Sequence, residues 1–260
     1  MWCTNCRTEH DGSAGGCPNC GAPAQKTKTD DPGPAASGGS DPLGTVDHTE
    51  IARRAKFDYS YGKRDASVKH LEVVQKLVDK GCRGHRDNRE LLQTAADMIY
   101  KEFRLKDVTL GLWNPREGIY RYEVMAGMQM SAWTALKRIS YTPEQFHDSV
   151  KYKGTLLGEQ TRLFLAEDEP YAEGEEDTYD RSEYLKSKRR TLDQSIEGDY
   201  LDTYIFAPGR EIIGWIEYAG TWGGRLPDTA TIRWVELVAT FLGTVIASHY
   251  TAKDMPARRL

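Results

Sequence analysis

The hydrophobic period of this chain changes twice along its length, and this restricts the fold more than any other feature. Apolar residues recur at spacings of three and four over residues 67–80, ending at Gly81 and Gly84, and again after a capping residue, Asp87, which predicts two helices. Over residues 108–126 the pattern becomes that of two strands joined by a turn. The helical period returns over residues 229–250. The sequence therefore predicts an α+β domain.

Further elements are predicted between these segments. Residues 142–145 read Thr-Pro-Glu-Gln, a capping box with proline at the first helical position, which predicts a short helix. A strand is predicted over residues 162–166, and a second hairpin over residues 201–219 with its turn at Pro208-Gly209-Arg210. We expect these strands to join the first hairpin in one sheet.

Composition limits the classes of function. The chain has 260 residues and is 39% apolar, which is enough for one large core. Its net charge of −4 provides no positive field that would attract nucleic acid or anionic lipid. No basic segment followed by an apolar stretch opens the chain, and the apolar run over residues 237–247 is too short to span a bilayer. We expect a soluble, unexported cytoplasmic protein with no membrane partner.

The chain divides into four regions by composition. Residues 1–23 are rich in cysteine and glycine and contain almost no large apolar side chains. Residues 24–65 are rich in proline, glycine, serine and charge, which predicts a flexible linker, although the aromatic residues of its last third could dock on the main domain. Residues 66–252 carry the α+β pattern, and residues 253–260 form a basic tail.

Four of the five cysteines form two pairs, Cys3 with Cys6 and Cys17 with Cys20. Two thiolate pairs at this spacing suit one tetrahedral zinc ion, and four thiolates leave no open coordination position. We therefore predict a structural zinc site, with His10 as a bystander.

Residues 1–23 resemble the short zinc-ribbon modules found at the ends of many bacterial and archaeal proteins. Such modules have nucleic-acid, protein and purely structural roles. Arg7 is the sole basic residue before Lys26, so contact with phosphates would be weak and a protein partner is favoured.

Three stretches of the main domain resemble GAF domains. Residues 164–168 (FLAED) are similar to the third strand of that family, residues 204–216 to its strand, turn and glycine-containing strand, and residues 234–238 (WVELV) to its last helix. The resemblance covers residues 66–252. It implies an antiparallel sheet of five or six strands with helices on one face and a ligand cavity on the other. It also implies a small-molecule ligand and a homodimer formed through the first and last helices.

Departures from the family narrow the function. The chain does not match the signature of the cyclic-nucleotide-binding members or the cysteine of the bilin-carrying members, and the main domain has a single cysteine, Cys82, where the methionine-sulfoxide reductases need several. No nucleophile, base and orienting group form a readable set, so we expect a non-enzymatic sensor or adaptor. A nucleic-acid-associated or transcriptional factor that uses the ribbon is the alternative. An enzyme with a degenerate GAF site is a third hypothesis, which a carboxylate or histidine inside the cavity would favour.

Large aromatic and sulfur-containing side chains are the candidate ligand contacts. They are Trp113, Tyr122, Met125, Trp133, Phe164, Tyr204, Phe206 and Trp215. Each could stack on a planar ligand or fill the core, and for any single residue the core is favoured. By strand alternation, Tyr120, Tyr122 and Val124 should share one face.

The acidic stretch over residues 167–183 lies where GAF domains commonly have a pocket lid. Tyr171 and Tyr179 within it, and Tyr184 just after it, could close over a ligand. Opposed acidic and basic blocks are more typical of a solvated loop followed by a short charged helix, and this interpretation is favoured.

Isolated histidines and the lone cysteine have two interpretations each. His85, His147 and His249 could ligate haem iron but are expected to be surface residues. Cys82 could sense oxidants because Arg83 and His85 lie near it, but an ordinary turn residue is favoured.

Overall fold

The computed structural model of the chain describes residues 66–83, 87–148, 150–152, 154–251 and 253–256, together with residues 53, 55 and 56. The four cysteines predicted to bind zinc, most of the predicted linker and His85 lie outside the described residues. The zinc ribbon therefore stays a prediction.

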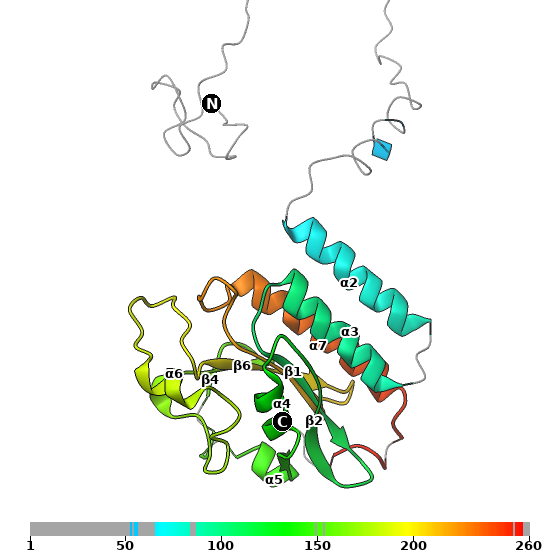
Figure 1. Cartoon of the computed structure of the whole chain (residues 1–260). Coiled ribbons are helices and arrows are strands. Elements are labelled where there is room, and N and C mark those ends of the chain that lie inside the picture. Colours follow the sequence, from blue (N-terminus) through cyan, green and yellow to red (C-terminus); the bar gives the residue numbers. More distant parts are fainter. Residues whose placement is uncertain are drawn as a thin grey trace, which may run out of the picture. The chain divides into compact units, whose positions relative to one another are not determined.

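Within the described residues, the centre of the domain is an antiparallel sheet of seven strands in the order β3-β2-β1-β7-β6-β5-β4 (Figure 1). The strands are β1 (Val108–Asn114), β2 (Ile119–Ala126), β3 (Ser140–Tyr141), β4 (Thr155–Leu156), β5 (Thr161–Phe164), β6 (Tyr200–Phe206) and β7 (Ile212–Tyr218). The α+β class is thus confirmed. The expected count of five or six strands is wrong because β3 and β4 have two residues each, too few to show a period in the sequence.

Six α-helices and a short 3-10 helix, η1 (Ala166–Asp168), accompany the sheet within the described residues from 66 onward. The α-helices are α2 (Ala66–Cys82), α3 (Asn88–Glu102), α4 (Met130–Leu136), α5 (Pro143–Phe146), α6 (Arg181–Lys186) and α7 (Thr229–Ala247). The predicted caps are confirmed: the Asp87 side chain accepts from the backbone N–H of Arg89, and Thr142 and Gln145 form the capping box of α5. Helix α4 was not predicted.

Helix α2 ends at Cys82, between Gly81 and Gly84, the two glycines that the sequence predicted as helix stops. Gly81 has another role in the packing, because a Cβ atom there would overlap the ring of Phe241 on α7. The glycine thus allows a close approach of α2 to α7.

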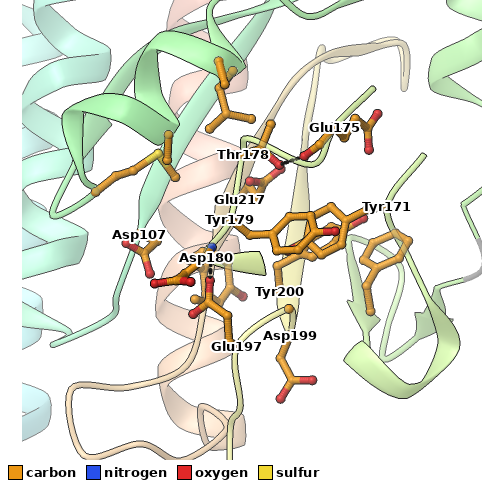
Figure 2. Close-up of a pocket in the computed structure, with 18 of the residues that line it drawn as sticks. Asp107, Tyr171, Glu175, Thr178, Tyr179, Asp180, Glu197, Asp199, Tyr200 and Glu217 are labelled. Carbon is orange, nitrogen blue, oxygen red and sulfur yellow. Dashed lines mark hydrogen bonds between the residues drawn. The ribbon is translucent and has the colours of Figure 1, made fainter. Parts of the chain in front are cut away.

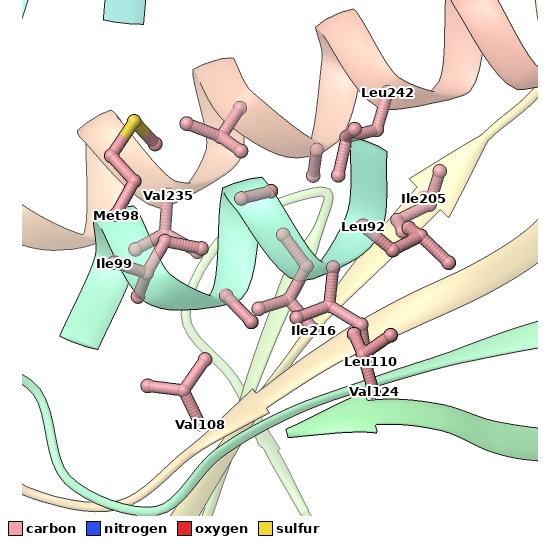
Figure 3. Close-up of a cluster of buried hydrophobic side chains, with 14 of the residues drawn as sticks. Leu92, Met98, Ile99, Val108, Leu110, Val124, Ile205, Ile216, Val235 and Leu242 are labelled. Carbon is pink, nitrogen blue, oxygen red and sulfur yellow. The ribbon is translucent and has the colours of Figure 1, made fainter. Parts of the chain in front are cut away.

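One face of the sheet, which we call the helix face, is covered by α3 and α7 (Figure 1). Figure 3 shows the aliphatic core between these helices and the sheet. It includes Leu92, Ile99, Ile216 and Val235. The 19 residues of α7 are long and apolar enough to cross a membrane by length and composition, contrary to our expectation. Core helices pass the same test, and the apolar face of α7 is buried against the sheet.

A β-bulge in β2 changes which side chains reach the opposite face, which we call the cavity face. Tyr122 pairs with Gly111 and Val124 pairs with Leu110, so Glu123 has no partner on β1. Tyr122 therefore packs on the cavity face whereas Val124 packs on the helix face. The expectation that both share one face is wrong because the extra residue reverses the alternation.

Candidate ligand-binding site

A cavity of about 1060 Å³ lies on the cavity face of the sheet. Its lining comes from β5, β6 and β7, from α4 and the chain around it, and from the acidic insertion over residues 167–183 (Figure 2). Small-molecule sites in proteins usually measure about 300–1,000 Å³. The cavity therefore has room for a ligand of cofactor size.

The floor of the cavity includes Trp215 of β7, which is 1% exposed. A Cβ atom on Gly111 would overlap its ring, so the glycine on β1 lets the indole lie across the neighbouring strand. The ring of Tyr122 meets the indole edge-on at 4.9 Å between centroids. A close backbone approach at Gly111 thus shapes the aromatic floor.

Two carboxyl groups stand side by side on this floor. Asp202 of β6 and Glu217 of β7 are directly opposite each other in the strand register. The Tyr122 hydroxyl donates to Glu217 Oε2 at 2.8 Å. Asp202 Oδ1 is buried and has no hydrogen-bond partner among the described residues. On its other side, Asp202 is opposite Arg162 of β5.

Burial and mutual repulsion perturb both carboxyl groups. Burial, and next the charge of Glu217, raise the pKa of Asp202 well above its usual range, while Arg162 opposes this change. Burial raises the pKa of Glu217 to about 7, against the hydrogen bond from Tyr122. Neighbouring carboxylates in a poorly solvated site resist double ionisation, which favours one shared proton on the pair.

The sequence contained a sign of this pair that we missed. Asp202 and Glu217 interrupt two strands that are otherwise largely apolar, the segments YLDTYIF and IIGWIEY. An acidic residue inside a strand buried on both faces costs free energy unless it has a specific partner or a function.

The acidic insertion forms the roof of the cavity. The rings of Tyr171 and Tyr179 stack at 4.0 Å (Figure 2). Tyr184 of α6 packs edge-on against Tyr179. Glu175 is 9% exposed and accepts from the Tyr152 hydroxyl at 2.7 Å. These residues are folded against the cavity, so the insertion is only in part the solvated loop that the sequence favoured. The short charged helix predicted after it is α6.

A polar anchor ties the two ends of this roof together. Asp199 has a fully buried side chain and accepts two hydrogen bonds from the Arg189 guanidinium, at 2.8 and 3.0 Å. The same guanidinium pairs with Glu167, and Asp199 also accepts from the backbone N–H groups of Ala166 and Ile196. The residues that begin and follow the insertion are thereby connected.

The predicted ligand contacts divide into two groups. Tyr122, Phe164, Tyr204 and Trp215 line the cavity. Trp113, Met125, Trp133 and Phe206 are not among its lining residues. The Trp113 indole instead donates to the carbonyl of Asp254, and Phe206 packs in the aromatic cluster beside the cavity.

The histidines and the cysteine lie elsewhere in the described structure. Neither His147 nor His249 lines the cavity, and His249 Nδ1 lies 3.0 Å from Asn88 Oδ1. Cys82 is exposed at the end of α2. The lining residues of the cavity therefore include neither an imidazole nor a thiol.

No protein-family model matches the chain, and no curated protein matches it. Among solved structures, the chain is similar to the GAF domain of a phosphoenolpyruvate-protein phosphotransferase from Acinetobacter, at 12% identity and a TM-score of 0.45, covering 68% of this chain and 92% of that one. It is also similar to the phycocyanobilin-bound GAF domain of a cyanobacterial phytochrome, at 9% identity and a TM-score of 0.46, covering 69% and 94%. A third is a free methionine-R-sulfoxide reductase from Neisseria meningitidis in complex with its substrate, at 13% identity and a TM-score of 0.45, covering 72% and 92%.

At these similarities, the ligands and the reaction of those proteins say nothing about this chain. The described domain itself has the antiparallel sheet, the helix-covered face and the opposite cavity that the GAF resemblance implies.

Proposed function

We propose that this chain is a non-enzymatic, cytoplasmic sensor or adaptor whose GAF-like domain binds a small molecule in the cavity and transmits its occupancy by contact with a partner protein. The observation that supports it is the cavity of about 1060 Å³ between the sheet and the folded insertion. The roof consists of loop and the six-residue α6, outside the aliphatic core. A ligand that contacts Tyr171 and Tyr179 therefore acts on the roof, whose conformation should change at a lower free-energy cost than that of the core.

The test is native mass spectrometry of gently purified full-length protein. It reports retained small molecules, subunit number and zinc content in one measurement. Ala132 lines the cavity from α4, so Ala132→Trp should fill the space and abolish retention of the ligand. Met130→Trp is the matched control, because Met130 is on the same helix, is 65% exposed and does not line the cavity. If both variants retain the ligand equally, the ligand does not bind in the cavity.

An acid–base enzyme is the second candidate, because two carboxyl groups with raised pKa values lie inside the cavity. The same sample decides between the two functions. A recovered ligand that keeps its mass after prolonged incubation with the protein supports binding alone. Conversion of the ligand by the parent but not by Glu217→Gln would establish the enzyme and overturn the sensor.

We further propose that the chain forms a homodimer through α2 and α7. Leu71 of α2 and Leu237 of α7 are each 45% exposed and border the same apolar groove. Leu237→Glu should give a monomer by light scattering, because it places a charge in the contact. Leu192→Glu is the control, since Leu192 is 97% exposed in a loop away from the groove. An unchanged mass for Leu237→Glu would place the dimer contact elsewhere.

The zinc ribbon enters the proposal from the sequence alone. We expect one zinc ion per chain, bound by Cys3, Cys6, Cys17 and Cys20, and its loss on replacing Cys3 and Cys6 by serine. We assign partner-protein contact to the ribbon. Retention of the full-length protein on DNA or RNA that weakens steeply with salt would favour the nucleic-acid alternative instead.

A further inference from the structure

Three charged residues form a row across neighbouring strands on the cavity face. Arg162 of β5 is opposite Asp202 of β6, which is opposite Glu217 of β7. The row thus contains one cationic and two potentially anionic groups. The Arg162 guanidinium also lies over the ring of Tyr204, 5.7 Å from its centroid. When both carboxyl groups are ionised, one negative charge in this row has no counterpart.

The unmatched charge coincides with an unused hydrogen-bond acceptor. Glu217 accepts from Tyr122, but Asp202 Oδ1 is buried with no partner among the described residues. Buried carboxylate oxygens nearly always have a donor, because leaving one unpaired is costly. Asp202 is a lining residue of the cavity, so a cation bound there would compensate the charge of this carboxyl group from the cavity side.

The rest of the lining favours the same ligand charge. Eleven acidic and only four basic residues line the cavity, so an anionic ligand would meet repulsion. Tyr171, Tyr179, Tyr200 and Trp215 supply aromatic rings, whose negative faces attract ammonium and guanidinium groups. Burial raises the pKa values of Tyr171 and Tyr200 well above their usual range, so both side chains stay neutral.

A metal ion would also balance the charge, but the arrangement does not suit one. In the part of the chain that the structure describes, no three histidine, cysteine, aspartate or glutamate side chains are grouped closely enough to hold a metal ion. Two carboxyl groups beside aromatic walls are better matched by a cation that carries its own N–H donors and an apolar body.

We infer that the cavity binds an organic cation, a small molecule whose ammonium or guanidinium group lies between Asp202 and Glu217 and whose apolar or aromatic body packs against Trp215 and the tyrosines of the roof. This inference rests on the proposed ligand-binding function and specifies its ligand class. The cation replaces the proton that the carboxyl pair otherwise shares, so its binding releases a proton to the buffer.

The experiment is isothermal titration of the full-length protein at pH 7.5 with two cations that carry N–H donors, tyramine and agmatine, and with tyrosol, in which a hydroxyl replaces the ammonium group of tyramine. We expect at least one cation to bind. Tyrosol should bind at least about tenfold more weakly than tyramine, because it lacks one charge-assisted contact. Asp202→Asn and Glu217→Gln should each weaken binding of that cation by about tenfold or more. Glu173→Gln, which removes an equal charge from an exposed residue of the insertion outside the lining, should bind as the parent does.

Misfolding is separated from loss of the site by the melting temperature. Asp202→Asn and Glu217→Gln remove repulsion between neighbouring carboxylates, so both should melt at or above the temperature of the parent while they bind less. Repeating the titration in buffers of different ionisation enthalpy should show proton release for the parent and less release for Glu217→Gln.

Failure of this inference and failure of the proposed function give different results. The inference is overturned if no cation binds up to about 10 mM, a range that detects millimolar dissociation constants, or if both neutral variants keep the affinity of the parent. Native mass spectrometry could instead find a neutral or anionic molecule in the parent and not in Ala132→Trp. This result would overturn the inference of a cationic ligand and leave the ligand-binding function intact. Absence of any retained or titrated ligand would overturn both.

Discussion

The two faces of the sheet are both largely buried, yet they are buried by different chemistry. On the helix face, aliphatic side chains such as Leu110, Ile205 and Ile216 pack under two long helices. On the cavity face, Trp215 and other aromatic side chains pack with carboxyl groups under a loop and short helices. Branched aliphatic side chains fill space at crystal-like density. Rings held edge-on under an irregular roof leave a cavity.

This difference separates stability from binding within one sheet. The helix face supplies most of the apolar area that holds the fold together, and α7 contributes buried residues from Val235 to Ala247. The cavity face contains a charge imbalance and an unpaired oxygen, features that weaken a fold but suit a binding site.

The largest predicted effect is loss of an aliphatic side chain from the helix face. Ile216→Ala should lower the free energy of unfolding by about 4 kcal/mol, because Ile216 is fully buried and the close-packed core cannot collapse around the space. Tyr179→Ala in the roof should cost only about 1 kcal/mol, the value of its stacking on Tyr171. Urea unfolding measures both, and equal losses would show that the roof is part of the stabilising core.

The second effect concerns how the roof is held. Arg189→Met should lower the free energy of unfolding by about 2–3 kcal/mol, because the buried carboxylate of Asp199 loses its cation. The insertion should also become sensitive to limited proteolysis, since its two ends lose their link. Arg210→Met, which breaks an exposed pair with Glu159, should cost less than about 1 kcal/mol and leave proteolysis unchanged. Resistance of the Arg189 variant to protease would mean that apolar contacts hold the roof.

Replacing a glutamate by glutamine should have a smaller effect on stability, of opposite sign on the two faces. The raised pKa of Glu217, about 7 against an ordinary value of 4.5, means that its contribution to stability is present below about pH 4.5 and is lost as the pH rises through 7. The groups that face it are Tyr122, Asp202 and Glu175, with Arg162 on the far side of Asp202. Glu217→Gln should therefore stabilise the protein by about 2 kcal/mol at pH 8 and have almost no effect at pH 4.

The matched change on the helix face is Glu236→Gln. Glu236 is buried and already accepts hydrogen bonds from Arg233 and Thr161, so its replacement should destabilise the protein at pH 8. Melting curves across pH 4–8 measure both variants. A destabilised Glu217→Gln at pH 8 would show that its charge is already compensated in the fold.

How much of this the sequence predicts depends on the length of each element. The long elements α3, α7 and the two hairpins show a hydrophobic period in the sequence, because burial selects apolar residues at regular spacing. Their positions were predicted to within a few residues. The seven-residue α4 and the two-residue strands are too short to leave one. The bulge at Glu123 is set by pairing with β1, which no local pattern records.

The cavity depends on register and packing, which are properties of the fold and not of single segments. Aromatic residues at 122, 164, 204 and 215 could be chosen from their type and strand position, but the same rule chose Trp113, Met125, Trp133 and Phe206, which do not line the cavity. Asp202 and Glu217 were each visible in the sequence. Only the register of β6 against β7 makes them a pair.

The smallest effect compares one tyrosine hydroxyl on each face. Tyr122→Phe removes the donor to Glu217 and should cost about 1 kcal/mol at pH 8, and less at pH 5, where Glu217 is protonated and needs no donor. Tyr218→Phe removes a hydroxyl that lies 3.2 Å from Thr203 Oγ1 on the helix face, a neutral pair, so its cost should not change with pH. Both substitutions remove a hydroxyl group from a tyrosine. Comparing the free energies of unfolding of the two variants at pH 5 and pH 8 therefore measures the effect of the Glu217 charge on the cavity face. A pH-independent Tyr122→Phe would mean that Glu217 remains protonated at pH 8, in which case this carboxyl group would hold no negative charge with which to attract a cation.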